Sequence, residues 1–358
     1  MESLKCRIRR DGPITFRDWM QAALYEPGSG YYNRKDLIRW GRAGDYRTSP
    51  ELSGLFAATF ARFFASLFRQ VGEPPLWTIV ESGAGNGEFA AGVLAAFKES
   101  YPPIFAATRY VIDDQSQDAG RLARERLAQV DRRIEFSSIG EIGKVDPGIF
   151  FSNELVDAFP VSLVTVENGE LQELYVELDS AMRFRYLAGP LSTQKLRGFL
   201  DQHSIDLKEG QVIEVNLQVS DWLSSIAEKL TAGYLITVDY GAEQQELYGL
   251  PERFKGTLRA FHRHRFVEVL SDPGRNDITA TVNWTQIRSV GEQVGLMSNS
   301  LMSLDQFMLR EGFLEELQQR LKASNSEAEK LKLTTEARDM ILPTGMASHF
   351  QVMIQKRV

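Results

Sequence analysis

A glycine-rich turn between an apolar run and a helical run constrains the fold of this chain more than any other feature. Residues 77–80 form a short apolar run, which ends at Glu81 and is typical of a buried strand in a parallel sheet. Residues 88–98 favour a helix. The turn between them contains alternate glycines: Gly83, Gly85 and Gly87. Glycine allows a tight turn and lets a ligand approach the backbone, where the free N–H groups of the helix start would face it.

The spacing of these glycines distinguishes between two kinds of ligand. A nicotinamide dinucleotide site would place the third glycine one position later, at Glu88, to bring helix and strand together over a pyrophosphate. The spacing found here, with Glu81 two positions before the first glycine, resembles the first motif of the S-adenosylmethionine-dependent methyltransferases. A glycine-rich turn without a ligand is the alternative, and the segments that follow disfavour it.

Acidic residues end a second predicted strand. The apolar run after Arg109 is followed by Asp113 and Asp114, and residues 117–130 favour a helix. In a doubly wound sheet, an acid at this place can accept hydrogen bonds from both hydroxyl groups of a ribose. Asp113 or Asp114 is therefore a candidate for that role, and the other is a solvated loop acid.

Polar residues also follow the fourth predicted strand, residues 148–152, which comes after a third over 134–137. An amide and two carboxylates lie there: Asn153, Glu154 and Asp157. Ligands of open α/β sheets bind beyond the carboxyl ends of the strands, so these side chains are expected to face the transferred group. Two carboxylates can grip a guanidinium group through paired, charge-assisted hydrogen bonds. A helix start with Asn153 as its cap and Glu154 favoured by the helix dipole explains the same residues equally well.

Composition and charge exclude several classes of protein. The 358 residues are 43% hydrophobic and 25% charged, which is ordinary for a soluble enzyme of one large or two smaller domains. The net charge of −7 disfavours a broad nucleic-acid surface. The single cysteine, Cys6, excludes a disulfide framework and fits a reducing compartment, so we expect a cytoplasmic protein. With only 4 histidines we expect no metal site, although the spacing of His262 and His264 also fits a metal pair.

We expect neither a membrane segment nor a secretory signal. The most apolar window, residues 55–68, is interrupted by Arg62 and is too short to span a bilayer, and the basic N-terminus has no apolar region. The phenylalanines of a helix predicted over 52–70 are interpreted as core. Residues 242–280 are expected to be irregular. The other predicted elements are a helix over 15–25 capped by Thr15, an antiparallel insertion over 161–190 with a hairpin turn at Asn168-Gly169, strands over 211–215, 234–239 and 349–355, and helices over 219–230, 284–295 and 304–327.

An ordered set of short motifs resembles one family, the MidA-like methyltransferases, which are relatives of the mitochondrial complex I assembly factor that methylates an arginine. The motifs are Gly30-Tyr31-Tyr32, Gly44 to Pro50, Glu81 to Gly87, Asn153 to Pro160, Asp239-Tyr240-Gly241, Gly256 to Arg259, Pro273 to Thr279 and Gln306-Phe307. Each motif alone is modest, but the ordered set is specific and runs over most of the chain.

The resemblance implies an α/β fold: a Rossmann-like seven-stranded class I methyltransferase sheet with a helical N-terminal region and a substrate-side insertion. Residues 1–73 would form the N-terminal region and cofactor lid, residues 74–160, 205–241 and 284–358 the core, and residues 161–204 and 242–283 the substrate-side subdomain. The residues that the resemblance assigns to S-adenosylmethionine are Glu81, Gly83, Gly85 and Gly87, with Asp114 in place of a usual Glu on the ribose and Thr48, Ser49 and Pro50 as the lid.

Two departures from the family pattern concern the acceptor side. A usual His and a usual acid are replaced by Thr281 and Asn283, and a usual Gly-Glu pair near the C-terminus is replaced by Ala347 and Ser348. If these side chains contact the substrate, the acceptor of this protein differs from that of its relatives.

We therefore expect methyl transfer from S-adenosylmethionine to a nitrogen atom, with an arginine side chain of a protein as acceptor. Glu154 and Asp157 would orient the guanidinium group while Asn153 positions it. A methyltransferase for a small molecule or another protein group, and a non-catalytic assembly protein that keeps the cofactor fold, are the alternatives; the glycine spacing disfavours a nicotinamide dehydrogenase. We expect an arginine-bearing protein as partner, and neither nucleic acid nor membrane. The apolar N-terminal helices leave a homodimer open.

Overall fold

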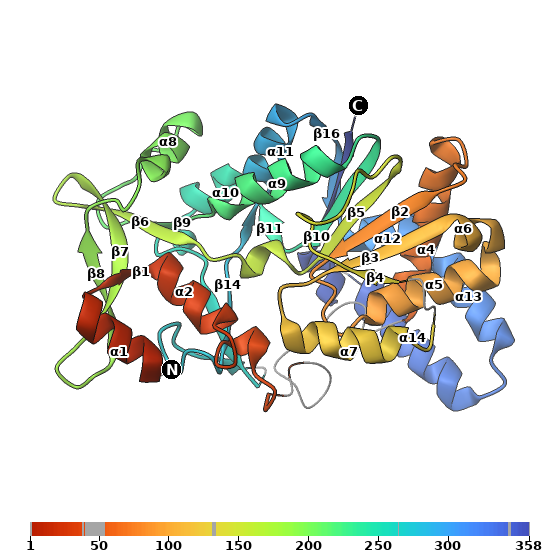
Figure 1. Ribbon diagram of the computed structural model, residues 1–358, viewed down its shortest axis with the longest axis horizontal. Helices are drawn as coiled ribbons and strands as arrows, with labels where there is room; N and C mark the ends of the chain where they lie inside the picture. Colours follow the sequence, from red (N-terminus) through yellow and green to blue (C-terminus); the bar gives the residue numbers. More distant parts are fainter. Residues whose placement is uncertain are drawn as a thin grey trace. The chain divides into compact units, whose positions relative to one another are not determined.

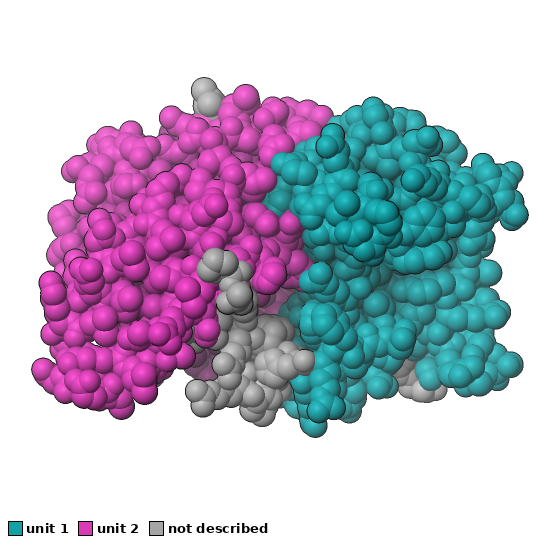
Figure 2. Space-filling model, turned by 180° about the vertical axis from the view of Figure 1, so that it is seen from behind, with its two compact units in different colours: residues 1–46, 156–222, 242–287 teal, residues 47–155, 223–241, 288–358 magenta. Residues whose placement is uncertain are grey.

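The computed structural model describes residues 2–37, 39, 54–130, 134–263, 265–342 and 345–357 of the chain. It divides into two compact units (Figure 2): unit 1 contains residues 1–46, 156–222 and 242–287, and unit 2 contains residues 47–155, 223–241 and 288–358. The predicted domain limits, with 1–73 as a separate region, divide the chain at other positions and stay a prediction. The predicted lid residues Thr48, Ser49 and Pro50 lie outside the described residues.

Unit 2 is built on a seven-stranded sheet in the order β16-β17-β10-β5-β2-β3-β4 (Figure 1). The five strands from β4 to β10 run parallel, whereas β17 runs antiparallel to both of its neighbours. The strands are β2 (Trp77–Ser82), β3 (Thr108–Asp113), β4 (Glu135–Phe136), β5 (Gly148–Asn153), β10 (Gly233–Asp239), β16 (Leu296–Ser303) and β17 (Gln351–Arg357). Both β2 and β10 are buried along their whole length, as their apolar runs predict. The predicted α/β fold with a seven-stranded, Rossmann-like sheet is confirmed.

Phenylalanine rings hold the helices of unit 2 against this sheet. The ring centroid of Phe60 lies 5.2 Å from that of Phe151 on β5 and 4.8 Å from that of Phe307. Phe89 stacks on Phe151 at 4.2 Å. All four rings are buried, and so are the other phenylalanines of α4, Phe56, Phe63, Phe64 and Phe68, so the core role predicted for the phenylalanines of this helix is confirmed. The helices of unit 2 are α4 (Gly54–Gln70), α5 (Glu88–Ser100), α6 (Pro102–Ala107), α7 (Gln117–Leu127), α12 (Leu304–Arg310), α13 (Phe313–Ala323), α14 (Glu327–Ile341) and η4 (Met346–His349).

Unit 1 contains a five-stranded sheet in the order β1-β7-β6-β9, with β8 also paired to β7. Asn168 and Gly169 both have positive φ, at 54° and 77°, which is the hairpin turn that their sequence predicts. The strand predicted over 211–215 forms β9, but it pairs with β6 here and not with a strand of the seven-stranded sheet. The strands of this sheet are β1 (Ile14–Thr15), β6 (Ser162–Glu167), β7 (Glu170–Leu178), β8 (Phe184–Gly189) and β9 (Val212–Val215).

The N-terminal helices of unit 1 pack through one face. Thr15 caps α2 as predicted, because its Oγ1 accepts a hydrogen bond of 3.1 Å from the backbone N–H of Asp18. The predicted apolar face of α2, including Trp19 and Met20, is fully buried. The helices of unit 1 and of its borders are α1 (Glu2–Asp11), α2 (Phe16–Tyr25), η1 (Tyr31–Asn33), η2 (Val156–Ala158), α8 (Gln194–Gln202), α9 (Gln218–Lys229), α10 (Gln244–Gly249), η3 (Pro251–Arg253) and α11 (Trp284–Gln293).

Several segments differ from the prediction. The single helix expected over 304–327 is interrupted at Gly312, whose φ of +93° breaks the helix before α13, and again before Ser326, whose side chain caps α14. The segment 242–280, expected to be irregular, contains β11 (Gly241–Ala242), β12 (Arg259–His262), β13 (Arg265–Phe266) and β14 (Asp277–Thr279), followed by β15 (Val282–Asn283). The strand β16 is absent from the sequence-based prediction, because serine and asparagine interrupt the alternation of apolar and polar residues that indicates a strand. Among the described helices, none combines the length and apolarity needed to span a membrane.

Candidate active site

The glycine loop of unit 2 connects β2 to α5 in the left-handed backbone region. The φ angles of Gly83, Gly85 and Gly87 are +72°, +55° and +76°. A Cβ on Gly83 would lie 2.8 Å from the Cδ1 of Leu155, a contact that a real side chain does not make. The N–H of Gly83 donates to the carbonyl of Asp113 at 2.7 Å. The loop is therefore fixed to the end of β3, and its backbone carries no side chain at the three glycines.

Both acids at the end of β3 hold this loop. The hydroxyl of Ser82 donates to the carboxylate of Asp113 at 3.0 Å. Asp114 accepts the N–H of Gly85 on one oxygen at 2.9 Å and the N–H of Ser116 on the other at 2.7 Å. Burial raises the pKa of Asp113. Neither acid is therefore merely a solvated loop residue, and the ribose role predicted for one of them stays a prediction.

Glu81 lies inside the sheet, although the sequence suggested that it ends the strand. β2 continues to Ser82, and the Glu81 side chain is 4% exposed. The hydroxyl of Tyr110 donates to its carboxyl group at 2.6 Å, which makes burial of this polar group tolerable. Burial raises the pKa of Glu81 to about 8, and the hydrogen bond from Tyr110 opposes part of that shift. Its contact with a cofactor stays a prediction.

The segment after β5 does not start a regular helix. Asn153 is the last residue of β5, and η2 is a single 3-10 turn, so the alternative of a helix capped by Asn153 is wrong. The Nδ2 of Asn153 donates to the Glu154 carboxylate at 3.0 Å. The φ of Glu154 is +51°, and its N–H donates to the carbonyl of Val238 at 2.9 Å. The left-handed conformation of Glu154 costs roughly 1–2 kcal/mol, because its side chain crowds the backbone there. Residues with such backbone strain occur more often at functional sites than elsewhere.

Asp157 is the third predicted acceptor residue and lies in η2, at the start of a stretch of unit 1. Its side chain is 5% exposed. The structure thus brings Asn153 and Glu154 together in unit 2, and the predicted cooperation of Asp157 with them stays a prediction.

A second polar cluster lies in unit 1, around Glu214 of β9. This buried carboxylate accepts the backbone N–H groups of Thr257 and Leu258 at 2.5 and 3.0 Å and the Thr257 hydroxyl at 3.3 Å. A Cβ on Gly256, whose φ is +86°, would collide with the Glu214 carboxylate. The predicted family motif Gly256 to Arg259 therefore forms a cradle for a buried anion. No local sequence pattern indicates this role of Glu214.

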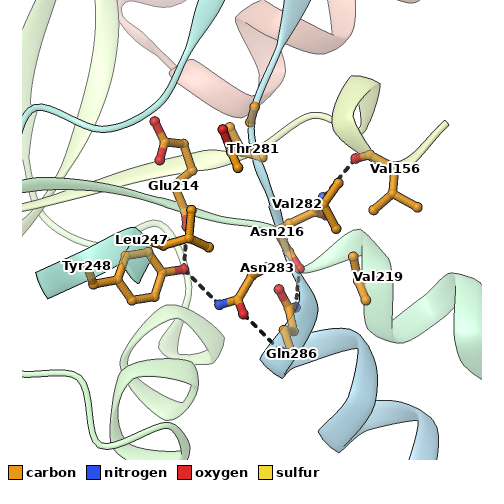
Figure 3. Close-up of a pocket in the computed structure, with 12 residues that line it drawn as sticks. Val156, Glu214, Asn216, Val219, Leu247, Tyr248, Thr281, Val282, Asn283 and Gln286 are labelled. Atoms are coloured by element: carbon orange, nitrogen blue, oxygen red, sulfur yellow. Dashed lines mark hydrogen bonds between the residues drawn. The ribbon is translucent and has the colours of Figure 1, made fainter. Parts of the chain in front are cut away.

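The departures at Thr281 and Asn283 fall in the same cluster (Figure 3). Asn283 accepts the N–H of Gln286 at 3.1 Å, which caps α11, and its Nδ2 donates to the hydroxyl of Tyr248 at 3.2 Å. An acid would cap this helix as well, so the change keeps that structural role. Thr281 and Asn283 line a cavity of about 20 Å³, which has room for about one water molecule and not for an arginine side chain.

The second departure, Ala347 and Ser348, lies in unit 2, and His262, one of the two histidines whose spacing also fits a metal pair, lies in unit 1. Ala347 is fully buried in the core of unit 2, and the hydroxyl of Ser348 donates to the carbonyl of Gly345 at 2.8 Å. The Nδ1 of His262 lies 3.2 Å from the carbonyl oxygen of Arg275, and His264 lies outside the described residues. In the part of the chain that the structure describes, no cluster of three or more His, Cys, Asp or Glu side chains is arranged to hold a metal ion.

The strand order of unit 2, the left-handed glycine loop and the acids at the end of β3 define a class I, Rossmann-like methyltransferase. The model of an S-adenosyl-L-methionine-dependent methyltransferase family matches residues 59–302. The chain belongs to this family, as the predicted resemblance to the MidA-like methyltransferases implied.

Individual relatives agree with this assignment. A protein of Drosophila melanogaster named as a mitochondrial protein arginine methyltransferase, the NDUFAF7 homolog, is 26% identical over 82% of this chain and 70% of its own length. The Homo sapiens protein arginine methyltransferase NDUFAF7, also named as mitochondrial, is 24% identical over 82% of this chain and 68% of its own length. These names give no support to the predicted cytoplasmic location.

Solved structures extend the likeness to nearly the whole chain. A crystal structure of a Burkholderia thailandensis protein bound to S-adenosylhomocysteine is similar at a TM-score of 0.87 with 29% identity, covering 99% of this chain and 91% of that one. A second structure from the same organism has a TM-score of 0.84 and 28% identity.

The residues of the glycine loop fit S-adenosylmethionine. The ligand has no pyrophosphate, so the loop needs only to pass close to a neutral adenosine and a charged amino-acid tail, which the glycines allow because they carry no side chains. Asp114 accepts the backbone N–H groups of Gly85 and Ser116, which places its carboxylate beside the glycine loop, and carboxylate oxygens are the acceptors that ribose hydroxyl groups need. When bound, the cofactor supplies a methyl group on a sulfonium, which is a good leaving group.

Proposed function

We propose that this S-adenosylmethionine-dependent methyltransferase methylates a nitrogen atom of an arginine side chain on a protein. The observation that carries the proposal is the strained backbone of Glu154 at the carboxyl end of β5, with its carboxylate oriented by Asn153. Acceptors of open α/β sheets are bound at this end of the strands. The names of the relatives, protein arginine methyltransferases, support the same acceptor.

The chemistry of arginine explains why carboxylates are needed. The guanidinium group stays protonated in water, with a pKa above about 12, so its nitrogen atoms are poor nucleophiles. A carboxylate beside it orients the planar group, localises its charge and can take up the proton that the nitrogen loses. We assign this role to Glu154 and Asp157, and assign to Asn153 the positioning of Glu154. Holding the acceptor in line with the donor supplies about 7–11 kcal/mol of the catalysis in such reactions.

Binding of the cofactor is tested first, by calorimetric titration of wild type and Gly85→Val with S-adenosylmethionine and S-adenosylhomocysteine. Binding of both by wild type and its loss in the variant are expected, because valine cannot adopt the +55° φ of Gly85 without strain. NADH serves as the control ligand and should not bind. Absence of binding to wild type would contradict the assignment of the loop.

The identity of the methyl acceptor is tested with S-adenosylmethionine carrying a labelled methyl group and an extract from cells that lack the protein. Incorporated label is identified by acid hydrolysis and mass spectrometry of the amino acids. We expect methylated arginine with wild type and about a hundredfold less with Glu154→Gln. Label on another residue or on a small molecule, or a Glu154→Gln protein as active as wild type, would contradict the proposal.

A further inference from the structure

Three hydrogen-bond donors from other segments hold the turn that carries Asp157, and each donates to a backbone carbonyl group of the turn. The carbonyl of Val156 accepts the Nδ2 of Asn216 at 3.4 Å, that of Asp157 accepts the N–H of Ala280 at 2.9 Å, and that of Ala158 accepts the hydroxyl of Tyr25 at 2.9 Å. These are consecutive residues of η2, and all are buried. The donors come from three separate segments of unit 1, so the turn cannot rotate without breaking a hydrogen bond to one of them.

Ala280 is itself held by its neighbour. The N–H of Thr281 donates to the Oγ1 of Thr257 at 3.1 Å, and the Thr257 hydroxyl donates in turn to Glu214 at 3.3 Å. A hydroxyl has one proton to give, so Thr257 can accept from Thr281 and donate to Glu214 at the same time. The direction of this relay requires an acceptor at Glu214, which a carboxylate supplies.

We propose that Tyr25 and the Glu214–Thr257 pair are positioning residues for methyl transfer, which fix the Asp157 turn through hydrogen bonds to its backbone and to the segment 280–281. This inference rests on the proposed function, in which the Asp157 carboxylate orients the acceptor guanidinium. It gives a role to Gly256-Thr257 that does not involve contact with substrate. A misplacement of about 1 Å in such a turn would slow the reaction about a hundredfold.

The conservative variants remove one hydrogen bond each. Tyr25→Phe keeps the ring and leaves the carbonyl of Ala158 without this donor. Thr257→Val keeps the shape and removes the hydroxyl between Thr281 and Glu214, whereas Thr257→Ser restores it. Tyr175→Phe is the matched control, because the Tyr175 hydroxyl also donates to a backbone carbonyl in unit 1, that of Pro190 at 2.8 Å, but in β7.

The measurement is the rate of labelled-methyl transfer from S-adenosylmethionine to proteins of the same extract, at varied cofactor concentration. We expect Tyr25→Phe and Thr257→Val to lower the apparent kcat about tenfold to a hundredfold with an apparent KM for S-adenosylmethionine within about twofold of wild type. Thr257→Ser and Tyr175→Phe should stay within about threefold of the wild-type kcat. Melting temperatures of all variants are recorded to distinguish a lower kcat caused by a misplaced turn from one caused by unfolded protein.

Each result decides the inference. Tyr25→Phe and Thr257→Val proteins that transfer methyl groups as fast as Tyr175→Phe would overturn it. So would a loss of kcat that Thr257→Ser fails to restore, or one that simply follows the fall in melting temperature across all variants. A wild-type protein that binds S-adenosylmethionine but labels nothing would instead contradict the proposed function, which the wild-type reaction tests separately.

Discussion

The hydroxyl group of Tyr110 donates a hydrogen bond of 2.6 Å to the carboxyl group of Glu81 between adjacent strands of unit 2. Both side chains are buried, at 2% and 4% exposure. Burial removes the hydration that stabilises a carboxylate, and it raises the pKa of Glu81 to about 8 from an ordinary 4.5. Without cofactor, Glu81 therefore keeps its proton in the folded protein over a pH range where the unfolded chain has lost it.

This pKa predicts a pH-dependent difference in stability between wild type and Glu81→Gln. The folded state binds one more proton than the unfolded state between pH 4.5 and about 8, so the stability of wild type falls as pH rises through this window. Glutamine can still accept the Tyr110 hydrogen bond and does not titrate. The variant should gain on wild type by on the order of 4 kcal/mol between pH 4.5 and 8, measured by chemical denaturation. Parallel stability profiles would contradict the burial of an ionisable Glu81.

The left-handed glycines predict that a single added methyl group weakens cofactor binding at Gly83 and leaves it unchanged at Gly72. Gly83→Ala places a Cβ 2.8 Å from Leu155 in addition to the strain of a φ of +72°. Gly72→Ala has a similar φ of +88°, but its Cβ would meet nothing within 4 Å. Both variants should lose about 1–2 kcal/mol of stability from the backbone alone.

Calorimetry with S-adenosylmethionine separates the two effects. Gly83→Ala should raise the Kd by about tenfold or more, because the Leu155 side chain or the loop must move to relieve the contact and the φ of +72° strains the loop itself, whereas Gly72→Ala should bind as wild type does. Equal affinities of the two variants would show that the glycine loop does not form the cofactor site.

The two acids at the end of β3 are distinguished by their amide variants. In Asp114→Asn, one of the N–H groups of Gly85 and Ser116 faces an amide that cannot accept it, and an acceptor for the ribose is lost. We expect about a tenfold to hundredfold weaker S-adenosylmethionine binding. Asp113→Asn keeps an oxygen for the Ser82 hydroxyl and loses only an acceptor for the backbone N–H of Ile139, which lies outside the glycine loop, so it should stay within about threefold of wild type. The reverse order would move the ribose role to Asp113.

Local sequence patterns account for the parts of the structure that could be predicted. The apolar run before Gly83 and the turn at Asn168-Gly169 are determined by residues next to one another, so their conformations follow from propensity. The hydrogen bonds of Glu214 join residues more than 40 positions apart, so no local pattern indicates them. Glu154 is the opposite case: glutamate disfavours the left-handed region, and only the surrounding structure imposes it.

Glu154 and Glu73 provide a matched test of whether the Glu154 carboxylate serves function. Their φ angles are nearly the same, +51° and +52°, but Glu73 is exposed in the turn after α4, whereas Glu154 follows β5 beside Asn153. Replacement by glycine relieves about 1–2 kcal/mol of backbone strain and loses about 0.5–1 kcal/mol through the freer unfolded chain. Glu154→Gly and Glu73→Gly should therefore both be as stable as wild type or up to about 1 kcal/mol more stable. Only Glu154→Gly should lose methyl transfer, about a hundredfold, because it alone removes a carboxylate from the acceptor site. If Glu154→Gly transfers methyl groups as fast as Glu73→Gly, the Glu154 carboxylate takes no part in the reaction.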